Sequence, residues 1–164
     1  MTLLPLLSAS PIIQLHVVSA VLALILGPFV IYGRRKLRVH KIMGYVWVLA
    51  MGAAALSSFG IHSFPVIGPF SPIHLLALFA LWSLFEGMRH IFQGRVTLHR
   101  VVMRSLYWRG LCVAGLFNFL PERTTNRMVF PDTPEAGYAV IAAGIAALVL
   151  AGARARLEGR AAGV

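Results

Sequence analysis

The sequence predicts an all-α membrane protein: a four-helix bundle of two parallel helical-hairpin repeats, followed by a fifth transmembrane helix. The 164 residues are 59% hydrophobic and only 12% charged, whereas about a quarter of residues are charged in an ordinary soluble domain. The apolar residues form runs close to the roughly 20 residues that a helix needs to cross a bilayer. Since the length suits one domain, we expect residues 1–164 to form a single integral membrane domain in contact with lipid.

Five apolar runs are expected to cross the membrane: residues 12–32, 42–61, 72–93, 98–120 and 136–153. Pro11, Pro72 and Pro134 stand at or just before helix starts, where the missing N–H costs little. The fifth run is the shortest, and its Ala and Gly content suits close helix packing. The apolar, Pro- and Gly-rich segment 62–71 is expected to be a connecting loop at the interface or a cap over a site.

The basic residues predict the orientation. The formal net charge of +10 is gathered in clusters between the runs, mostly on one side of the predicted bundle. Only Arg123 and Arg127 fall on the opposite side, among several acids. By the positive-inside rule we expect a bacterial inner-membrane protein with its N-terminus outside and its C-terminus cytoplasmic. No nucleic-acid motif or basic stripe interleaved with aromatic residues is present, so the charge predicts no nucleic-acid partner.

Other kinds of chemistry find no support in the sequence. Cys112 is the only cysteine, which excludes a disulfide, a CxxC redox pair or covalent haem attachment within the chain. The sequence contains no P-loop, dinucleotide fingerprint, Ser-His-Asp set or paired carboxylates, so hydrolysis and phosphoryl transfer are not indicated.

Histidines occupy matching places in the two halves. His16, near the outer end of the first run, is followed 24 positions later by His40 at the inner start of the second; His74 and His99 are 25 positions apart in the third and fourth runs. Both inner turns begin Gly-Arg and end in a His-Lys or His-Arg pair. This pattern indicates a duplicated hairpin, with repeat one at about 12–61 and repeat two at about 72–120. Because both copies begin outside, the repeats are parallel.

The duplication predicts two layers of histidine, His16 with His74 and His40 with His99. Two histidines on facing helices are the axial ligands of a b-type haem. We therefore expect two haem b groups, with the histidines as iron ligands, in a small protein that passes electrons across or within the membrane. Its partner would be a quinone or another redox protein, and its enzyme class a membrane oxidoreductase. A single histidine at a membrane interface is more often a hydrogen-bonding residue; the two symmetric layers favour haem.

Arg109 lies deep in the fourth run, about 18 Å from its inner end at the usual helical rise. A cation at this depth is normally paired, and Glu86 is the only acid in any run. We expect a structural Glu86–Arg109 ion pair. Two alternatives stay open. Arg109 could bind a haem propionate or an anionic substrate with its planar fork, and Glu86 could pair locally with Arg89 and His90.

Several blocks resemble a family of uncharacterised bacterial membrane proteins, domain of unknown function 2306: "VHKIMGYVWV", "FSPIHLL" and "HRVVMRSLYWRGLCVAGLFNFLPER". The resemblance covers about the first four runs and implies a membrane fold and candidate histidine positions, but no reaction. Lys41 stands where the family usually has arginine, and the second Pro-x-Arg is Pro121-Glu122-Arg123 in this chain. The layered histidines are also similar in arrangement, although not in sequence blocks, to transmembrane cytochrome b561, whose alternate helices supply two bis-histidine haems.

Two other functions remain open on the sequence alone. Parallel repeats, a midplane arginine and titratable histidines also suit a proton-coupled transporter, for which five spans are few unless the chain forms a homodimer. A non-catalytic scaffold or assembly subunit, whose histidines only anchor helix ends, is the third candidate. A tetrahedral zinc site is poorly supplied because neither histidine layer has an added Asp or Cys.

Overall fold

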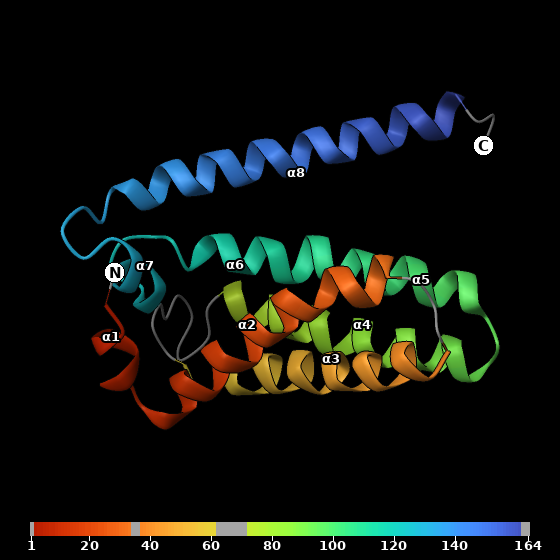
Figure 1. Cartoon of the computed structure of the whole chain (residues 1–164), viewed down its shortest axis with the longest axis horizontal. Coiled ribbons are helices and arrows are strands. Elements are labelled where there is room, and N and C mark those ends of the chain that lie inside the picture. The colour runs from red at the N-terminus through yellow and green to blue at the C-terminus, as the bar shows by residue number, and fades with distance from the viewer. Residues whose placement is uncertain (1, 34–36, 62–71, 162–164) are drawn as a thin grey trace. The chain divides into compact units, whose positions relative to one another are not determined.

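The computed structural model describes residues 2–33, 37–61 and 72–161, and within these ranges the chain is helical with no strand. In order (Figure 1), the helices are α1 (Leu4–Leu7), α2 (Pro11–Tyr32), α3 (Leu37–Ser58), α4 (Pro72–Phe92), α5 (Val96–Ser105), the π-helix η1 (Leu106–Cys112), α6 (Val113–Phe117), α7 (Thr124–Val129) and α8 (Ala136–Ala161). His62 and the rest of the predicted 62–71 loop lie outside the described residues.

Four helices are individually long and apolar enough to cross a membrane: Pro11–Tyr32, Arg38–Ser58, His74–Phe92 and Ala136–Ala153. They confirm the prediction of an all-α protein with several membrane-spanning helices. The predicted fourth run is also helical from Val96 to Phe117, but its middle is the π-helix η1, so it divides into three consecutive elements. The second helix begins five residues earlier than the predicted Ile42, with Leu37.

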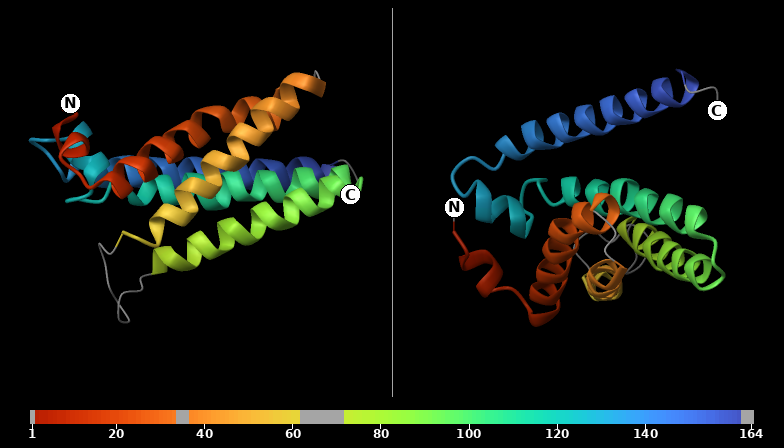
Figure 2. Two further views of the ribbon diagram at one scale, coloured as in Figure 1. Left: turned by 90° about the horizontal axis from the view of Figure 1, so that it is seen from below. Right: turned by 45° about the vertical axis from the view of Figure 1, so that its right-hand side comes forward.

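The chain forms two compact units, Leu7–Ala114 and the combination of Met1–Leu6 with Gly115–Val164. In the larger unit, contacts join α2 to α3, α3 to α4, and α4 to α5 and η1, which in turn contact α2. These rods therefore close a ring, which can be followed in the right-hand view of Figure 2. In this ring α2 and α4 are diagonal to each other, as are α3 and α5.

The middle of this unit is filled by aromatic side chains packed on small residues. Trp47 is 1% exposed and donates its Nε1–H to the carbonyl oxygen of Ala23 at 2.9 Å. Tyr107 is also buried and lies against Gly27, where a Cβ would overlap its ring. Ala23 and Gly27, one turn apart on α2, are therefore in contact with aromatic rings from α3 and η1.

Pro28 interrupts the hydrogen bonding of α2. Proline has no N–H, so the carbonyl of Leu24, four residues earlier, lacks its usual helical donor. The Tyr107 hydroxyl donates to this carbonyl at 3.2 Å. In a membrane, where water cannot replace the missing donor, a side chain from a neighbouring helix must satisfy the backbone. The expectation from the sequence that no span has an interior proline is therefore wrong.

The smaller unit is organised around Asn126 of α7, which is fully buried. Its Nδ2 group donates to the carbonyl oxygens of Phe119 at 2.7 Å and Pro134 at 2.9 Å, and so joins the segments on either side of α7. The backbone N–H of Thr2 donates to the carbonyl oxygen of Met128 at 2.9 Å, which attaches the N-terminal residues to the same unit. Partial burial lowers the pKa of nearby Arg123, because desolvation disfavours its charged form.

Candidate functional site

His16 is held by the C-terminal half of α3. Its Nδ1 lies 2.8 Å from the carbonyl oxygen of Ala54 and 3.2 Å from Ser57 Oγ. A carbonyl oxygen can only accept, so Nδ1 carries the proton and donates it. In the neutral ring this leaves the lone pair on Nε2, for which the described residues provide no hydrogen-bond donor. The ring is thereby fixed in the tautomer that ligates a metal through Nε2.

His99 has the same hydrogen bond at the other end of the unit. Its Nδ1 donates to the carbonyl oxygen of Gly87 in α4 at 2.8 Å, and its Nε2 likewise has no donor among the described residues. The Met103 side chain of α5 occupies the place that a Cβ of Gly87 would take, so α5 lies close to α4 at this point. One histidine from each predicted layer is thus half-buried and oriented by a neighbouring backbone carbonyl.

His74 and His40 complete the two predicted pairs by position. His74 is 5% exposed, and its ring centroid lies 5.6 Å from that of Phe59, just after α3. His40, in the first turn and a half of α3, is half-buried. His16 and His74 therefore approach the same end of α3 from the diagonal helices α2 and α4. His40 and His99 start the other diagonal pair, α3 and α5, at the opposite end.

The space between these two ends is filled by side chains, contrary to the expectation that it has room for a haem. The small residues on the His16 face of the first span are expected to leave room for a flat macrocycle. Instead Trp47 and Tyr107 pack over that face at Ala23 and Gly27. A haem is therefore excluded from the middle of the unit by close packing. The ends differ: on the helix segments next to His16 and His74 the buried residues are small, namely Ser19, Ala54, Ala55, Ser57, Ser58, Ala77 and Ala80, whereas Met51 and Leu84 are buried one turn further along α3 and α4.

The expected Glu86–Arg109 ion pair is wrong. Glu86 pairs with Arg89 at 3.0 Å and lies 3.6 Å from His90 Nε2, which is the local alternative one helical turn along α4. Arg109 is exposed and has no ion-pair partner among the described residues. Helical geometry explains the difference, because positions i+3 and i+4 meet without reaching another helix. Since Arg109 faces outward, it is also badly placed to reach a propionate between the histidines.

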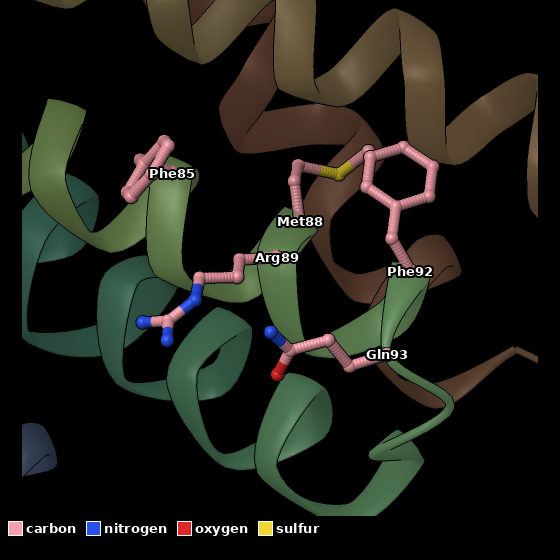
Figure 3. Close-up of a pocket in the computed structure, with 5 residues that line it drawn as sticks. All are labelled: Phe85, Met88, Arg89, Phe92 and Gln93. Atoms are coloured by element: carbon pink, nitrogen blue, oxygen red, sulfur yellow. The ribbon is translucent and has the colours of Figure 1, made fainter.

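A shallow hollow of about 350 Å³ lies on α4 at the end occupied by His99. Phe85, Met88, Arg89, Phe92 and Gln93 line it, and Figure 3 shows Met88 and Phe92 on one side of α4 with Arg89 and Gln93 on the other. The hollow is open rather than enclosed between histidines, so it does not by itself form a haem pocket. No three His, Cys, Asp or Glu residues within the described ranges gather at a metal-binding distance; a bis-histidine haem needs only two protein ligands.

Three residues that shape the site are missing from the sequence interpretation. Trp47, Tyr107 and Pro28 determine how the middle of the unit is filled, and two of them lie inside the quoted family blocks. Pro28 is the sequence feature that could have indicated these contacts, because an interior proline in a membrane helix requires a hydrogen-bond donor from a neighbouring helix. The sequence shows that a donor is needed, but it does not show which helix supplies it.

The comparisons with known proteins give one match. The family described as "Predicted membrane protein (DUF2306)" matches residues 13–153, which covers most of the chain and all four histidines. A search of curated proteins and a search of solved structures each found no match.

Proposed function

We propose, from the premise that this chain belongs to the DUF2306 family of predicted membrane proteins, that it is a small haem b protein that passes electrons across or within the membrane. In this proposal His16 with His74, and His40 with His99, hold one haem at each end of the larger unit. The two hairpins are parallel repeats, α8 is a fifth membrane-crossing helix, and the protein lies in the bacterial inner membrane with its N-terminus outside.

The observation that carries the proposal is the shared orientation of His16 and His99. Each donates Nδ1–H to a backbone carbonyl of an adjacent helix at 2.8 Å and keeps Nε2 free. This second hydrogen bond is the usual companion of a metal-ligating imidazole, because it fixes the ring and raises the basicity of the ligating nitrogen. Two histidines that served only as interface anchors would need no such common arrangement.

The surroundings fit haem at the two ends and not in the middle. At the end with His16 and His74, small buried side chains line the helices, and His74 is screened from the exterior. At the other end, His40 and His99 lie among the exposed cations Arg38, Lys41, Arg95 and Arg100, which suit the carboxylates of a haem. Haem would supply one-electron transfer there. The histidines orient it, and the buried Trp47 and Tyr107 keep water out of the middle of the protein.

An absorption spectrum tests the proposal directly. Protein purified from haem-supplemented cells is expected to show a b-type Soret band, and an α band after reduction with dithionite, with about two haems per chain. His16→Ala and His99→Ala are each expected to remove about half of the bound haem, because each variant removes a ligand from a different layer. His90→Ala is the matched control, since His90 is half-buried in α4 and bonded to Glu86 but belongs to neither layer.

Two results would overturn the proposal. One is a colourless wild-type protein that is folded and monodisperse. The other is haem content that stays unchanged in both the His16 and the His99 variants, which would place any bound haem elsewhere. If the wild-type protein is coloured and the variants lose haem as expected, quinone reduction assays would identify the electron acceptor.

A further inference from the structure

A cluster of aromatic and cationic side chains lies where the end of α2 meets α5 and η1 (Figure 1). It consists of Tyr32, Arg104 and Trp108, here named the Tyr32 cluster. Trp108 donates its Nε1–H to the Tyr32 hydroxyl at 2.8 Å. The Arg104 guanidinium carbon lies 4.9 Å from the centroid of the Tyr32 ring, in cation–π range. All three side chains are exposed.

The cluster is braced from inside the protein. The Trp108 ring stands edge-on to Tyr107, with centroids 5.2 Å apart and an interplanar angle of 85°. Tyr107 is in turn fixed by its hydrogen bond to the Leu24 carbonyl, which Pro28 leaves without a helical donor. A continuous series of contacts therefore connects the exposed cluster to the backbone of α2. This arrangement holds the polar groups in place before any ligand binds, which lowers the entropic cost of binding.

The cluster has hydrogen-bond donors that lack acceptors. The contact with the Tyr32 ring leaves the N–H groups of Arg104 available, and the described residues offer them no acceptor. The Tyr32 hydroxyl accepts from Trp108, so its own proton remains available for donation. Charged donors at the surface of an apolar helix bundle are costly to leave unpaired. An anion that accepts several hydrogen bonds at once would satisfy these donors.

Arg109 lies one turn from this cluster. Arg104 stands two residues before the start of η1. In a π-helix the backbone hydrogen bonds join residues i and i+5. Arg109 therefore follows Arg104 by one such turn. Both side chains are exposed. Side chains on a helix tilt toward its N-terminus, which directs Arg109 toward Arg104 and the end where α2 terminates. A ligand at the Tyr32 cluster therefore explains why this span contains an outward-facing cation.

We propose that the Tyr32 cluster, with Arg109, binds the phosphodiester headgroup of an anionic phospholipid in the leaflet at this end of the bundle. Tyrosine and tryptophan favour the headgroup level of a membrane, and Tyr32 ends a membrane-spanning helix. Arginine binds phosphate oxygens with two parallel hydrogen bonds, and basic sites between transmembrane helices are suited to anionic headgroups. This inference goes beyond the proposed haem function and does not depend on it.

Quenching of tryptophan fluorescence by brominated lipids tests the proposal, because Trp108 would be next to the bound lipid. In mixed vesicles, we expect brominated phosphatidylglycerol to be preferred over brominated phosphatidylcholine by about tenfold, equivalent to about 1.4 kcal/mol. Arg104→Gln is expected to reduce the preference to near one. Tyr32→Phe keeps the ring under Arg104 but removes the hydroxyl, so a several-fold reduction is expected. Arg38→Gln, which removes an exposed cation from α3, is the matched control and should keep the preference.

The following results count against the proposal, provided that the variants elute as monodisperse, helical protein. Equal quenching by the two lipids in the wild type would overturn it. So would an undiminished preference in Arg104→Gln, or an equal loss in Arg38→Gln, which would indicate a diffuse effect of net charge. If millimolar glycerol phosphate removes the preference, the cluster binds a soluble phosphate rather than a membrane lipid, and the lipid assignment is wrong.

Discussion

At Gly27 a hydrogen atom in place of a methyl group allows α2 and η1 to touch. The ring of Tyr107 occupies the position that a Cβ would take, and the same tyrosine supplies the hydrogen bond that Pro28 removes from α2. Two adjacent residues of the first span thus depend on one residue of the fourth. This contact is also the base of the Tyr32 cluster, because Trp108 packs against Tyr107.

Gly27→Ala is expected to lower the stability of the protein. The added methyl group overlaps Tyr107, and overpacking of this kind typically costs about 1–3 kcal/mol. Gly44→Ala in α3 is the control, since no atom lies within 4 Å of its added Cβ and alanine favours a helix over glycine by up to about 1 kcal/mol. Thermal unfolding in one detergent should therefore give a lower midpoint for Gly27→Ala and an unchanged or higher midpoint for Gly44→Ala. Equal midpoints would mean that the helices separate at Gly27 without cost.

The candidate histidines could be identified from the sequence because their spacing is nearly the same in the two halves, and spacing along a helix determines depth. Their hydrogen bonds could not be identified in this way. The acceptors of His16 and His99 are the backbone carbonyls of Ala54 and Gly87, and every residue has such a carbonyl. Which carbonyl faces a histidine depends on the rotation of each helix about its axis. The same rotation turns Arg109 outward, which is why its predicted pairing with Glu86 failed.

Among the elements, the fourth run differs most from its prediction. Hydropathy and length predict a span at 98–120, and the chain is indeed helical from Val96 to Phe117. The π-helical segment in its middle has no hydropathy signal, because a change from i+4 to i+5 bonding alters which residues share a face and not how apolar they are. This change affects Leu106–Cys112, the segment that carries Tyr107, Trp108 and Arg109. Its consequence is therefore the direction of those side chains.

The short helix α7 gives a prediction at the scale of an element. Asn126 donates to two carbonyls on either side of α7, so Asn126→Ala removes both donors and leaves the carbonyls unpaired. At about 1 kcal/mol for each net hydrogen bond, local opening should increase by about 5–30-fold. In detergent, trypsin is expected to cleave after Arg123 and Arg127 faster by a similar factor. Thr125→Ala is the control at the adjacent position. Equal cleavage rates in the two variants would show that Asn126 does not hold this segment.

At the scale of the molecule, the described residues separate into a dry middle and two polar ends. Trp47 and Tyr107 fill the middle, while His16 and His74 lie toward one end and His40 and His99 toward the other. The exposed cations Arg38, Lys41, Arg95, Arg100 and Arg104 gather at the second end, which also contains the Tyr32 cluster. The proposed redox groups and the proposed lipid site therefore depend on the same asymmetry, and both depend on the orientation of the protein in the membrane.

That orientation gives the last prediction. By the positive-inside rule, the end with the clustered cations faces the cytoplasm, so Gln93 should be cytoplasmic and Glu135 external. Both residues are exposed and stand just outside a helix, and each can be replaced by cysteine after Cys112→Ser. A membrane-impermeant maleimide applied to intact spheroplasts should label Glu135→Cys at once and Gln93→Cys only after permeabilisation. The reverse order would place the Tyr32 cluster in the outer leaflet and the histidines of α2 and α4 toward the cytoplasm. Labelling of both positions in intact cells would place them on the same side of the membrane. The chain from Val96 to Phe117, which lies between them, would then not cross the membrane.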